Sequence, residues 1–187
     1  MLNKSIRKKQ PGKNPKGISG LFPLLFLLVM GLHGQTILKP IETIKVSGVA
    51  EVFFAYGEPS QMVKEISGRI VPEVIIDFKD GILQVSTKGE AQGEKVRIYI
   101  SGNALKTIEV DERAQFHGQN SIASEYLKIV SSDHGAVDLA VNSNRLHVVM
   151  DGGDITLSGT AKECFTERNE SKNWGSLDFS NLKVAQL

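Results

Sequence analysis

The 187-residue chain has little of several residue types, and each shortage excludes a class of protein. A single cysteine excludes a disulfide framework within the chain and a multi-cysteine zinc site. Six prolines exclude a proline-rich linker or a collagen-like chain. Aromatic residues make up only 6% of the chain, which disfavours sugar binding through aromatic platforms. No phosphate loop, nucleophile elbow or metal-ligand cluster is present, so we expect no catalytic residues, no cofactor and no bound metal.

Positive charge is concentrated at the start of the chain, where no acidic residue precedes position 34. The basic residues there are Lys4, Arg7, Lys8, Lys9, Lys13 and Lys16. The rest of the chain is therefore net acidic. We expect no nucleic-acid partner, since phosphate binding needs a basic face.

An apolar run over residues 21–32 follows the basic segment. The run is shorter than the ~20 residues that a membrane-spanning helix needs. A basic start, a short apolar run and small residues after it are typical of an export signal, so we predict a cleavable signal peptide over residues 1–34. Cleavage after Gly34 or after Gly31 fits, and an uncleaved anchor is the alternative. The mature chain, residues 35–187, is then expected in the periplasm, on the outer cell surface or in the medium, without a transmembrane span.

Alternation of apolar and polar residues predicts β-strands along the mature chain. The runs that carry this pattern over its first part are 43–46, 51–54, 74–78, 82–85 and 96–100. Asp80 and Gly81 between two of these runs indicate a hairpin turn. No long stretch has a helical stripe, so we predict an all-β protein with an antiparallel β layer over residues 35–100.

A repeat of seven positions marks the second part of the chain. Its four units are Glu112–Gly118, Asp133–Leu139, Asp151–Leu157 and Asn173–Phe179. Their starts are 21, 18 and 22 residues apart. The third position is Ala or Gly, and the fifth is always apolar. Because one unit is too small to bury its apolar residues alone, we expect the units to stack with these columns in register.

Stacked units form a parallel β-solenoid over residues 101–187, which makes a single domain together with residues 35–100. The small third position and the Asp at the first position suit tight corners, where a left-handed backbone or a close approach is expected. The corner residues are Asp133, Gly135, Asp151, Gly153 and Gly175. Glu112 suits a corner less well, so the first unit is expected to turn differently. An antiparallel sandwich with regular turns is the alternative.

These segments resemble the "putative auto-transporter adhesin, head GIN domain" family of exported bacterial proteins. The matching segments are Ile44–Val52, Asp80–Val85, Val96–Ile100 and Leu105–Val110, and the glycine-containing repeats follow them. The resemblance implies a right-handed parallel β-helix with an N-terminal β layer, a place in a Gram-negative envelope, a role in adhesion and no catalytic residues. The family's repeats usually read Ser-Gly-x-Gly-Asp/Asn, and this chain has Asp133 and Asp151 at the first Gly.

The sixth repeat position faces outward between two core positions, because side chains alternate along a strand. Its column, with Asp154 on the flanking fourth position, is the candidate binding site: His117, Asp138, Thr156, Asp178 and Asp154. We expect an exported, non-catalytic module for cell-surface interaction, adhesion or scaffolding. The alternative is a carbohydrate-binding or carbohydrate-cleaving β-helix protein that uses this column. The expected partner is a protein or a glycan of the envelope or the extracellular space. Joining of two stacks at their ends would give an end-to-end oligomer of this chain as an additional arrangement.

Three other features have two interpretations each. The acidic column Glu112, Asp133 and Asp151 either forms corners or binds Ca²⁺, and we expect corners because no calcium-loop spacing is present. Cys164 is expected to be a buried small residue rather than half of an intermolecular disulfide. Trp174 is expected to cover the open end of the stack rather than to stack on a ligand.

Overall fold

The structure is a computed structural model that describes residues 36–37, 39–67, 72–89, 95–169 and 174–185. The chain divides into two compact units, Met1–Gly31 and Leu32–Leu187, and every described residue lies in the second unit. The expected signal peptide, residues 1–34, lies outside the described residues, so its cleavage sites stay predictions.

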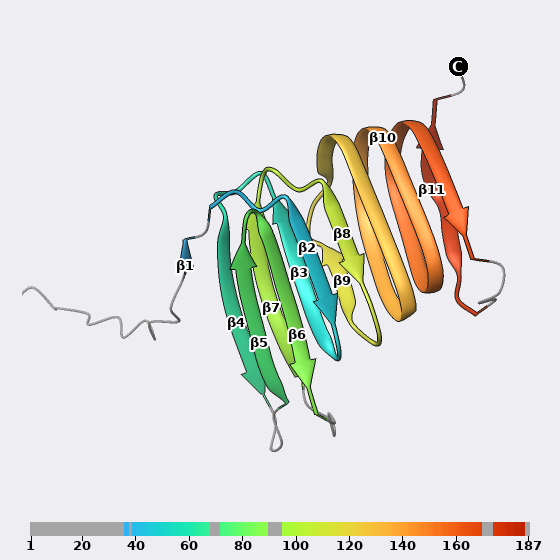
Figure 1. Ribbon diagram of the computed structural model, residues 1–187. Coiled ribbons are helices and arrows are strands. Elements are labelled where there is room, and N and C mark those ends of the chain that lie inside the picture. Colours follow the sequence, from blue (N-terminus) through green and yellow to red (C-terminus); the bar gives the residue numbers. More distant parts are fainter. Residues whose placement is uncertain (1–35, 38, 68–71, 90–94, 170–173, 186–187) are drawn as a thin grey trace, which may run out of the picture. The chain divides into compact units, whose positions relative to one another are not determined.

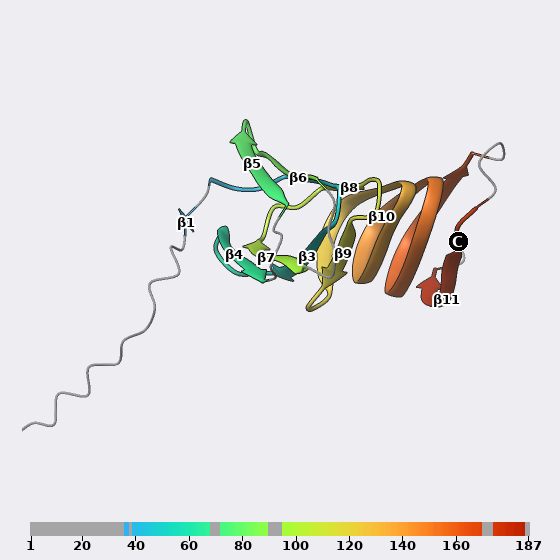
Figure 2. The ribbon, with the colours of Figure 1, turned by 90° about the horizontal axis from the view of Figure 1, so that it is seen from below.

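The described residues form strands that join one mixed, strongly curled sheet (Figures 1 and 2). The strands are β1 (Thr36–Ile37), β2 (Thr43–Ser47), β3 (Ala50–Tyr56), β4 (Gln61–Ser67), β5 (Glu73–Lys79), β6 (Ile82–Lys88), β7 (Lys95–Gly102), β8 (Thr107–Val110), β9 (Gln115–Gly118), β10 (Ile122–Arg168) and β11 (Leu177–Val184). β10 contains 47 residues and winds through successive turns, so that its own segments lie side by side (Figure 1). In the described part of the chain, no helix is long and apolar enough to cross a membrane. The prediction of an all-β protein is confirmed.

The sheet is built from coils, by which we mean two consecutive strands that turn once round its curled surface. The β2–β3 coil lies between the β6–β7 coil and the β8–β9 coil, although β2 and β3 precede both in the sequence. These pairings are parallel, whereas β1–β4, β4–β7 and β5–β6 are antiparallel and lie at the two ends of the strand order. The expected antiparallel layer over residues 35–100 is therefore only partly correct, because β2 and β3 belong to the parallel part.

The registers between neighbouring strands bring the repeat columns together. Phe116 of β9 pairs with Val137 of β10, and Ile155 of β10 pairs with Leu177 of β11. These four residues hold the fifth position of their units, as the sequence predicted. The pairings of β10 with β8, β9 and β11 are parallel, which contradicts the antiparallel sandwich.

Residues 48–54 form a further unit of the repeat that the sequence pattern alone did not reveal. Val52 pairs with Phe116 and Phe54 pairs with Gly118, so β3 shares the columns of the repeat. Gly48, Glu112 and Asp133 hold the same corner position, and their φ angles are +88°, +57° and +46°. The corner at Glu112 therefore turns like that at Asp133, in contrast to our expectation that the first unit would turn differently.

The glycine corners combine left-handed backbone with close approach of neighbouring coils. Gly153 and Gly175 have φ angles of +78° and +113°, and a Cβ at Gly153 would overlap the carbonyl oxygen of Gly135. Gly135 does not have the positive φ that we expected, but a Cβ there would lie 2.6 Å from a carbonyl oxygen of β8. At the third corner, Gly152 rather than Asp151 takes the left-handed conformation, with φ +100°. Glycine is thus required at some corners because the backbone φ is positive, and at others because a neighbouring coil leaves no space for a Cβ atom.

The inward side chains of the coils make one apolar core. Alternate residues are buried along β2 and β3, as expected for strands with one face inside. Phe54 and Phe116 are fully buried in successive coils, with ring centroids 6.0 Å apart. Because the interior is filled in this way, the outer face and the corners are left for contacts with other molecules.

Candidate functional site

The residues of the predicted outer column lie in one line across the outer face of the sheet. His117 pairs in register with Asp138, and Thr156 pairs with Asp178. The close contact between Gly153 and Gly135 puts Thr156 beside Asp138. Asp138, Thr156 and Asp178 are exposed, and His117 is half-buried. Tertiary structure thus brings four residues from four separate units of the sequence together.

Two aromatic residues extend this line beyond the residues that the repeat predicted. Phe53 pairs in register with both His117 and Tyr99. The Phe53 ring stacks on both, with ring centroids 5.2 Å from His117 and 5.3 Å from Tyr99. The outer row, as we name the whole line, consists of Tyr99, Phe53, His117, Asp138, Thr156 and Asp178. Because Phe53 lies between the other two rings, both of its faces are covered and mainly its edge is available to a ligand.

Two acidic residues of the candidate site, Asp154 and Asp178, already bind neighbouring parts of the chain. Asp154 Oδ1 accepts hydrogen bonds from the backbone N–H and the hydroxyl group of Ser176, both at 2.8 Å. Asp178 Oδ1 accepts a 2.8 Å hydrogen bond from the backbone N–H of Ser180. Hydrogen bonds from the backbone and the side chain of Ser180 lower the pKa of the Asp178 carboxyl group. Asp154 therefore connects β10 to the residue just before β11, and Asp178 binds the backbone within β11, while both carboxylates also face solvent.

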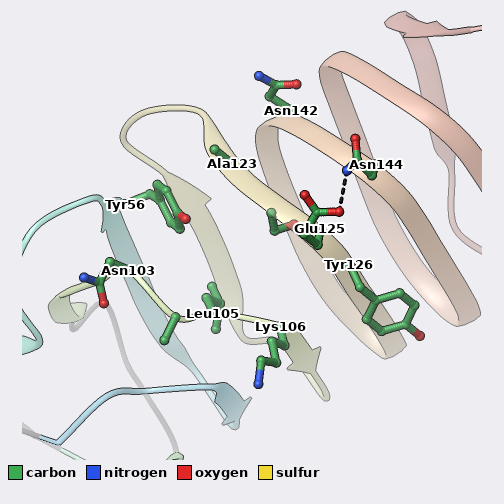
Figure 3. A pocket seen from close by; sticks show the side chains of 11 residues that line it. Tyr56, Asn103, Leu105, Lys106, Ala123, Glu125, Tyr126, Asn142 and Asn144 are labelled. Carbon is green, nitrogen blue, oxygen red and sulfur yellow. Dashed lines mark hydrogen bonds between the residues drawn. The ribbon is translucent and has the colours of Figure 1, made fainter.

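A groove of about 570 Å³ lies elsewhere, at the corner where β7 leads into β8 and where β10 begins. It is lined by Tyr56, Asn103, Ala104, Leu105, Lys106, Ala123, Ser124, Glu125, Tyr126, Asn142 and Asn144. Figure 3 shows Tyr56 and Asn103 on one side of it, and Glu125 and Asn144 on the other. No candidate residue from the sequence lies here, because these corners carry no motif. The only sequence signal is the asparagine-rich corner 142–144.

Hydrogen bonds between successive coils hold the polar side chains of this groove. The Asn144 amide donates from Nδ2 to Glu125 Oε2 (Figure 3). The Thr160 hydroxyl donates to Asn142 Oδ1 at 3.1 Å, and the hydroxyl groups of Ser124 and Ser143 lie 3.4 Å apart. Each bond joins residues 18 or 19 positions apart, so the side chains are ordered by the stacking of the coils.

Trp174 packs along the corners of the stack. Its ring stacks on His134 with centroids 4.4 Å apart, and its Cη2 atom lies 2.6 Å from where a Cβ of Gly152 would stand. His134, Gly152 and Trp174 hold the second position of three units, so the indole reaches His134 across the glycine. One face of the indole is therefore occupied by His134, which argues against the ligand-platform interpretation. The role of Trp174 is to join three corners rather than to cover the end of the stack.

Cys164 is half-buried and packs against the apolar core, and burial raises the pKa of its thiol group. The prediction of a buried residue is therefore only partly correct, because the side chain is half-buried against the core. Among the described residues, no three or more His, Cys, Asp or Glu side chains converge on a metal site.

The fold and these surfaces define a class of protein. It is an all-β chain with a curled, mixed sheet, whose polar groups lie in an exposed row and in an open groove at the corners. The chain belongs to the family described as "Putative auto-transporter adhesin, head GIN domain", whose model matches residues 41–187. The resemblance inferred from the sequence is thereby confirmed.

Solved structures that share the fold are described as putative adhesins. One from Bacteroides fragilis has 18% sequence identity and a TM-score of 0.62, over 80% of this chain and 71% of that chain. One from Parabacteroides distasonis has 23% identity and a TM-score of 0.58, over 82% and 74% of the two chains. One from Parabacteroides merdae has 19% identity and a TM-score of 0.58, over 80% and 72%. No curated protein matches the chain.

Proposed function

We propose that the chain is an exported, non-catalytic module that mediates cell-surface interaction or adhesion. Membership of a family described as putative adhesins supports this role. The observation that carries the proposal is the outer row, in which six side chains from neighbouring coils stand in register on one exposed face. Because strand pairing fixes the spacing of these side chains, binding through them costs less conformational entropy than binding through a disordered segment.

The coils also support a finer description of the architecture, a right-handed parallel β-helix with antiparallel strands at its ends. The parallel registers of β2, β3, β8, β9, β10 and β11 favour this description. A β-helix suits an adhesion module because every added coil lengthens the exposed face without changing the core.

The arrangement of acidic groups supports a non-catalytic role. Glycoside hydrolysis needs two carboxyl groups on opposite sides of the bond to be cleaved. Glu125 is the one carboxylate among the residues that line the groove, and it already accepts a hydrogen bond from Asn144. In the outer row, Asp138 and Asp178 are separated by Thr156, at twice the strand spacing of about 4.8 Å.

Attachment of protein-coated beads to cells tests the proposed role. Fluorescent beads that carry the purified full chain are incubated with intact bacterial and epithelial cells, and the bound fluorescence is counted. We expect the folded chain to bind and the heat-unfolded chain to bind much less. Equal binding of the two preparations would contradict a role for the folded surface.

Reversal of charge in the outer row locates the contact. Asp138→Arg is expected to lower bead attachment, because it places a cation between His117 and Thr156 in the middle of the row. Asp77→Arg is the matched control, since Asp77 is an exposed residue of β5 outside the row. If both variants attached as well as the original chain, the outer row would not be the contact surface.

A further inference from the structure

The groove at the corners of the coils is distinct from the outer row and continues along the stack. Besides the main groove of about 570 Å³, a second hollow of about 330 Å³ is lined partly by the same residues, Asn142 and Asn144. The second hollow extends from these residues to Thr160 and Lys183 in the following coils. A ligand that occupies both would lie across several coils, along the direction in which they stack.

The polar groups along this path suit a ligand that carries many hydroxyl groups. Asn103, Asn142 and Asn144 each present an amide, which has both donors and an acceptor, and Ser124 adds a hydroxyl group. The bonds Asn144 to Glu125 and Thr160 to Asn142 fix two of these amides in place. Fixed amides and hydroxyls can donate to one sugar hydroxyl group and accept from the next.

Two of the three tyrosines of this aromatic-poor chain line the groove. Tyr126 is held in position by its neighbours, since its hydroxyl group lies 3.4 Å from His147 Nδ1 and Arg145 lies over its ring at 5.8 Å. Tyr56 is anchored through its backbone, whose N–H donates to Asn120 Oδ1 at 2.7 Å. Because Arg145 lies over one face of the Tyr126 ring, Tyr56 is the ring that we assign as the apolar surface for the C–H face of a sugar ring.

The charges in the main groove favour a neutral ligand, and the neutral sugar units are assigned to this groove because two lysines, Lys162 and Lys183, line the second hollow. Lys106 forms a 3.0 Å ion pair with Glu42, and Glu125 accepts a hydrogen bond from Asn144. One cation and one carboxylate thus line the main groove, and both have partners within the protein. The apolar residues there are two alanines and Leu105, whose side chain is only 2% exposed. This lining lacks the continuous apolar surface that a lipid chain needs.

We propose that this corner groove binds a neutral, extended oligosaccharide, with successive sugar units aligned along successive coils. Neighbouring strands lie about 4.8 Å apart, which is close to the length of one pyranose unit in an extended glycan. Each coil can then present one set of polar side chains to one sugar unit. The ligand class goes beyond surface attachment as such, and the site differs from the outer row.

Binding of defined neutral oligosaccharides to the purified full chain tests this proposal. The probes are the neutral tetrasaccharides of glucose, mannose and N-acetylglucosamine, with the matching mono- and disaccharides and with tetragalacturonate as an anionic control. Isothermal titration calorimetry should detect binding of at least one neutral tetrasaccharide, with affinity that rises from mono- to tetrasaccharide. Absence of binding by all neutral tetrasaccharides, or tighter binding of tetragalacturonate, would overturn the proposal.

Substitutions in the groove test its location. Asn103→Ala and Asn144→Ala should each weaken tetrasaccharide binding about threefold to tenfold, the effect of losing one or two neutral hydrogen bonds. Asn181→Ala is the matched control, because Asn181 is an exposed residue of β11 outside the groove. Asp138→Arg in the outer row should also leave the affinity unchanged. Equal affinity of the groove variants and the controls, with unchanged melting temperatures, would place the sugar elsewhere and overturn the assignment.

The outcomes also separate this inference from the proposed role in attachment. If beads attach to cells but no tetrasaccharide binds, the oligosaccharide inference fails and the attachment role stands. If a tetrasaccharide binds in the groove but beads do not attach, the inference is supported and the attachment role is contradicted.

Discussion

At the scale of single residues, the corners decide how closely the coils can approach. Gly48, Gly153 and Gly175 all have positive φ, and a Cβ at any of them would overlap atoms of the neighbouring coil. Asp133 and Glu112 also adopt left-handed conformations, which cost non-glycine residues free energy. Asp is a known exception because its short side chain tolerates this region, whereas Glu is not, and for this reason the corner at Glu112 was predicted incorrectly.

Gly153→Val should destabilise the chain far more than Thr156→Val. Valine at 153 would have to adopt φ +78° and would overlap the carbonyl oxygen of Gly135. The backbone strain alone costs about 1–3 kcal/mol, and the overlap adds to it. Thr156 is exposed, and valine favours strands, so the second variant should change stability by less than about 0.5 kcal/mol. Thermal melts of the two variants make the comparison, and equal melting temperatures would mean that these corners do not pack as described.

Cys164 should react slowly with iodoacetamide in the folded chain at pH 7–8. Burial raises the pKa of its thiol group, so the reactive thiolate is less populated in the folded than in the unfolded state. The rate should rise with pH, and it should rise strongly when the chain is unfolded in urea. Equal rates for folded and unfolded chain, or a disulfide-linked dimer on a non-reducing gel, would contradict the buried-residue interpretation.

At the scale of elements, the parallel strands align side chains in register on the outer face of the sheet as well as on the inner face. Phe53 in β3 has an aromatic neighbour in β7 and an aromatic neighbour in β9. The sequence predicted four of the six residues of this row from the repeat. It did not reveal the other two, Phe53 and Tyr99, because β3 and β7 lie before the recognised units.

Phe53→Ala should lower the free energy of unfolding by about 1–3 kcal/mol, because it removes two aromatic contacts that are each worth about 0.5–1.5 kcal/mol. Thr156→Ala, in the same row but with no aromatic contact, is the matched control and should have a much smaller effect. Urea denaturation followed by circular dichroism measures both. A loss for Phe53→Ala no larger than that for Thr156→Ala would show that the stack does not stabilise the face.

At the scale of the whole molecule, the order of coils differs from the order of the sequence. The β2–β3 coil has β6–β7 on one side and β8–β9 on the other, so both of its neighbours are formed by later residues. The chain leaves this coil, forms β4 and β5 at the edges, returns through β6 and β7, and then continues on the opposite side. The groove depends on this arrangement, because Tyr56 at the end of β3 thereby lies beside Asn103 and Ala123.

Export of the chain should remove its basic and apolar start. The segment up to residue 34 has the composition of a cleavable signal, so N-terminal sequencing of the protein from the envelope fraction should begin at Leu32 or Gln35. Protein from the cytosol of cells with blocked export is the control and should begin at Met1. An envelope form that still begins at Met1 would instead support an uncleaved anchor.

The sequence by itself determined the strand class, the buried face of most strands and the register of the repeat. Alternation of apolar and polar residues predicts which side chains face the core. Similar residues at the corners of each unit allow the units to be aligned column by column. Phe116 with Val137 and Ile155 with Leu177 could therefore be paired from the sequence. Only the tertiary structure decided the position of the β2–β3 coil and the place of Phe53 and Tyr99 in the outer row. It also decided the contact of Trp174 with His134 and the presence of the groove. Many orders of coils satisfy the same alternation, and the one adopted depends on how all coils pack together. Side chains from distant segments meet only once that order is set.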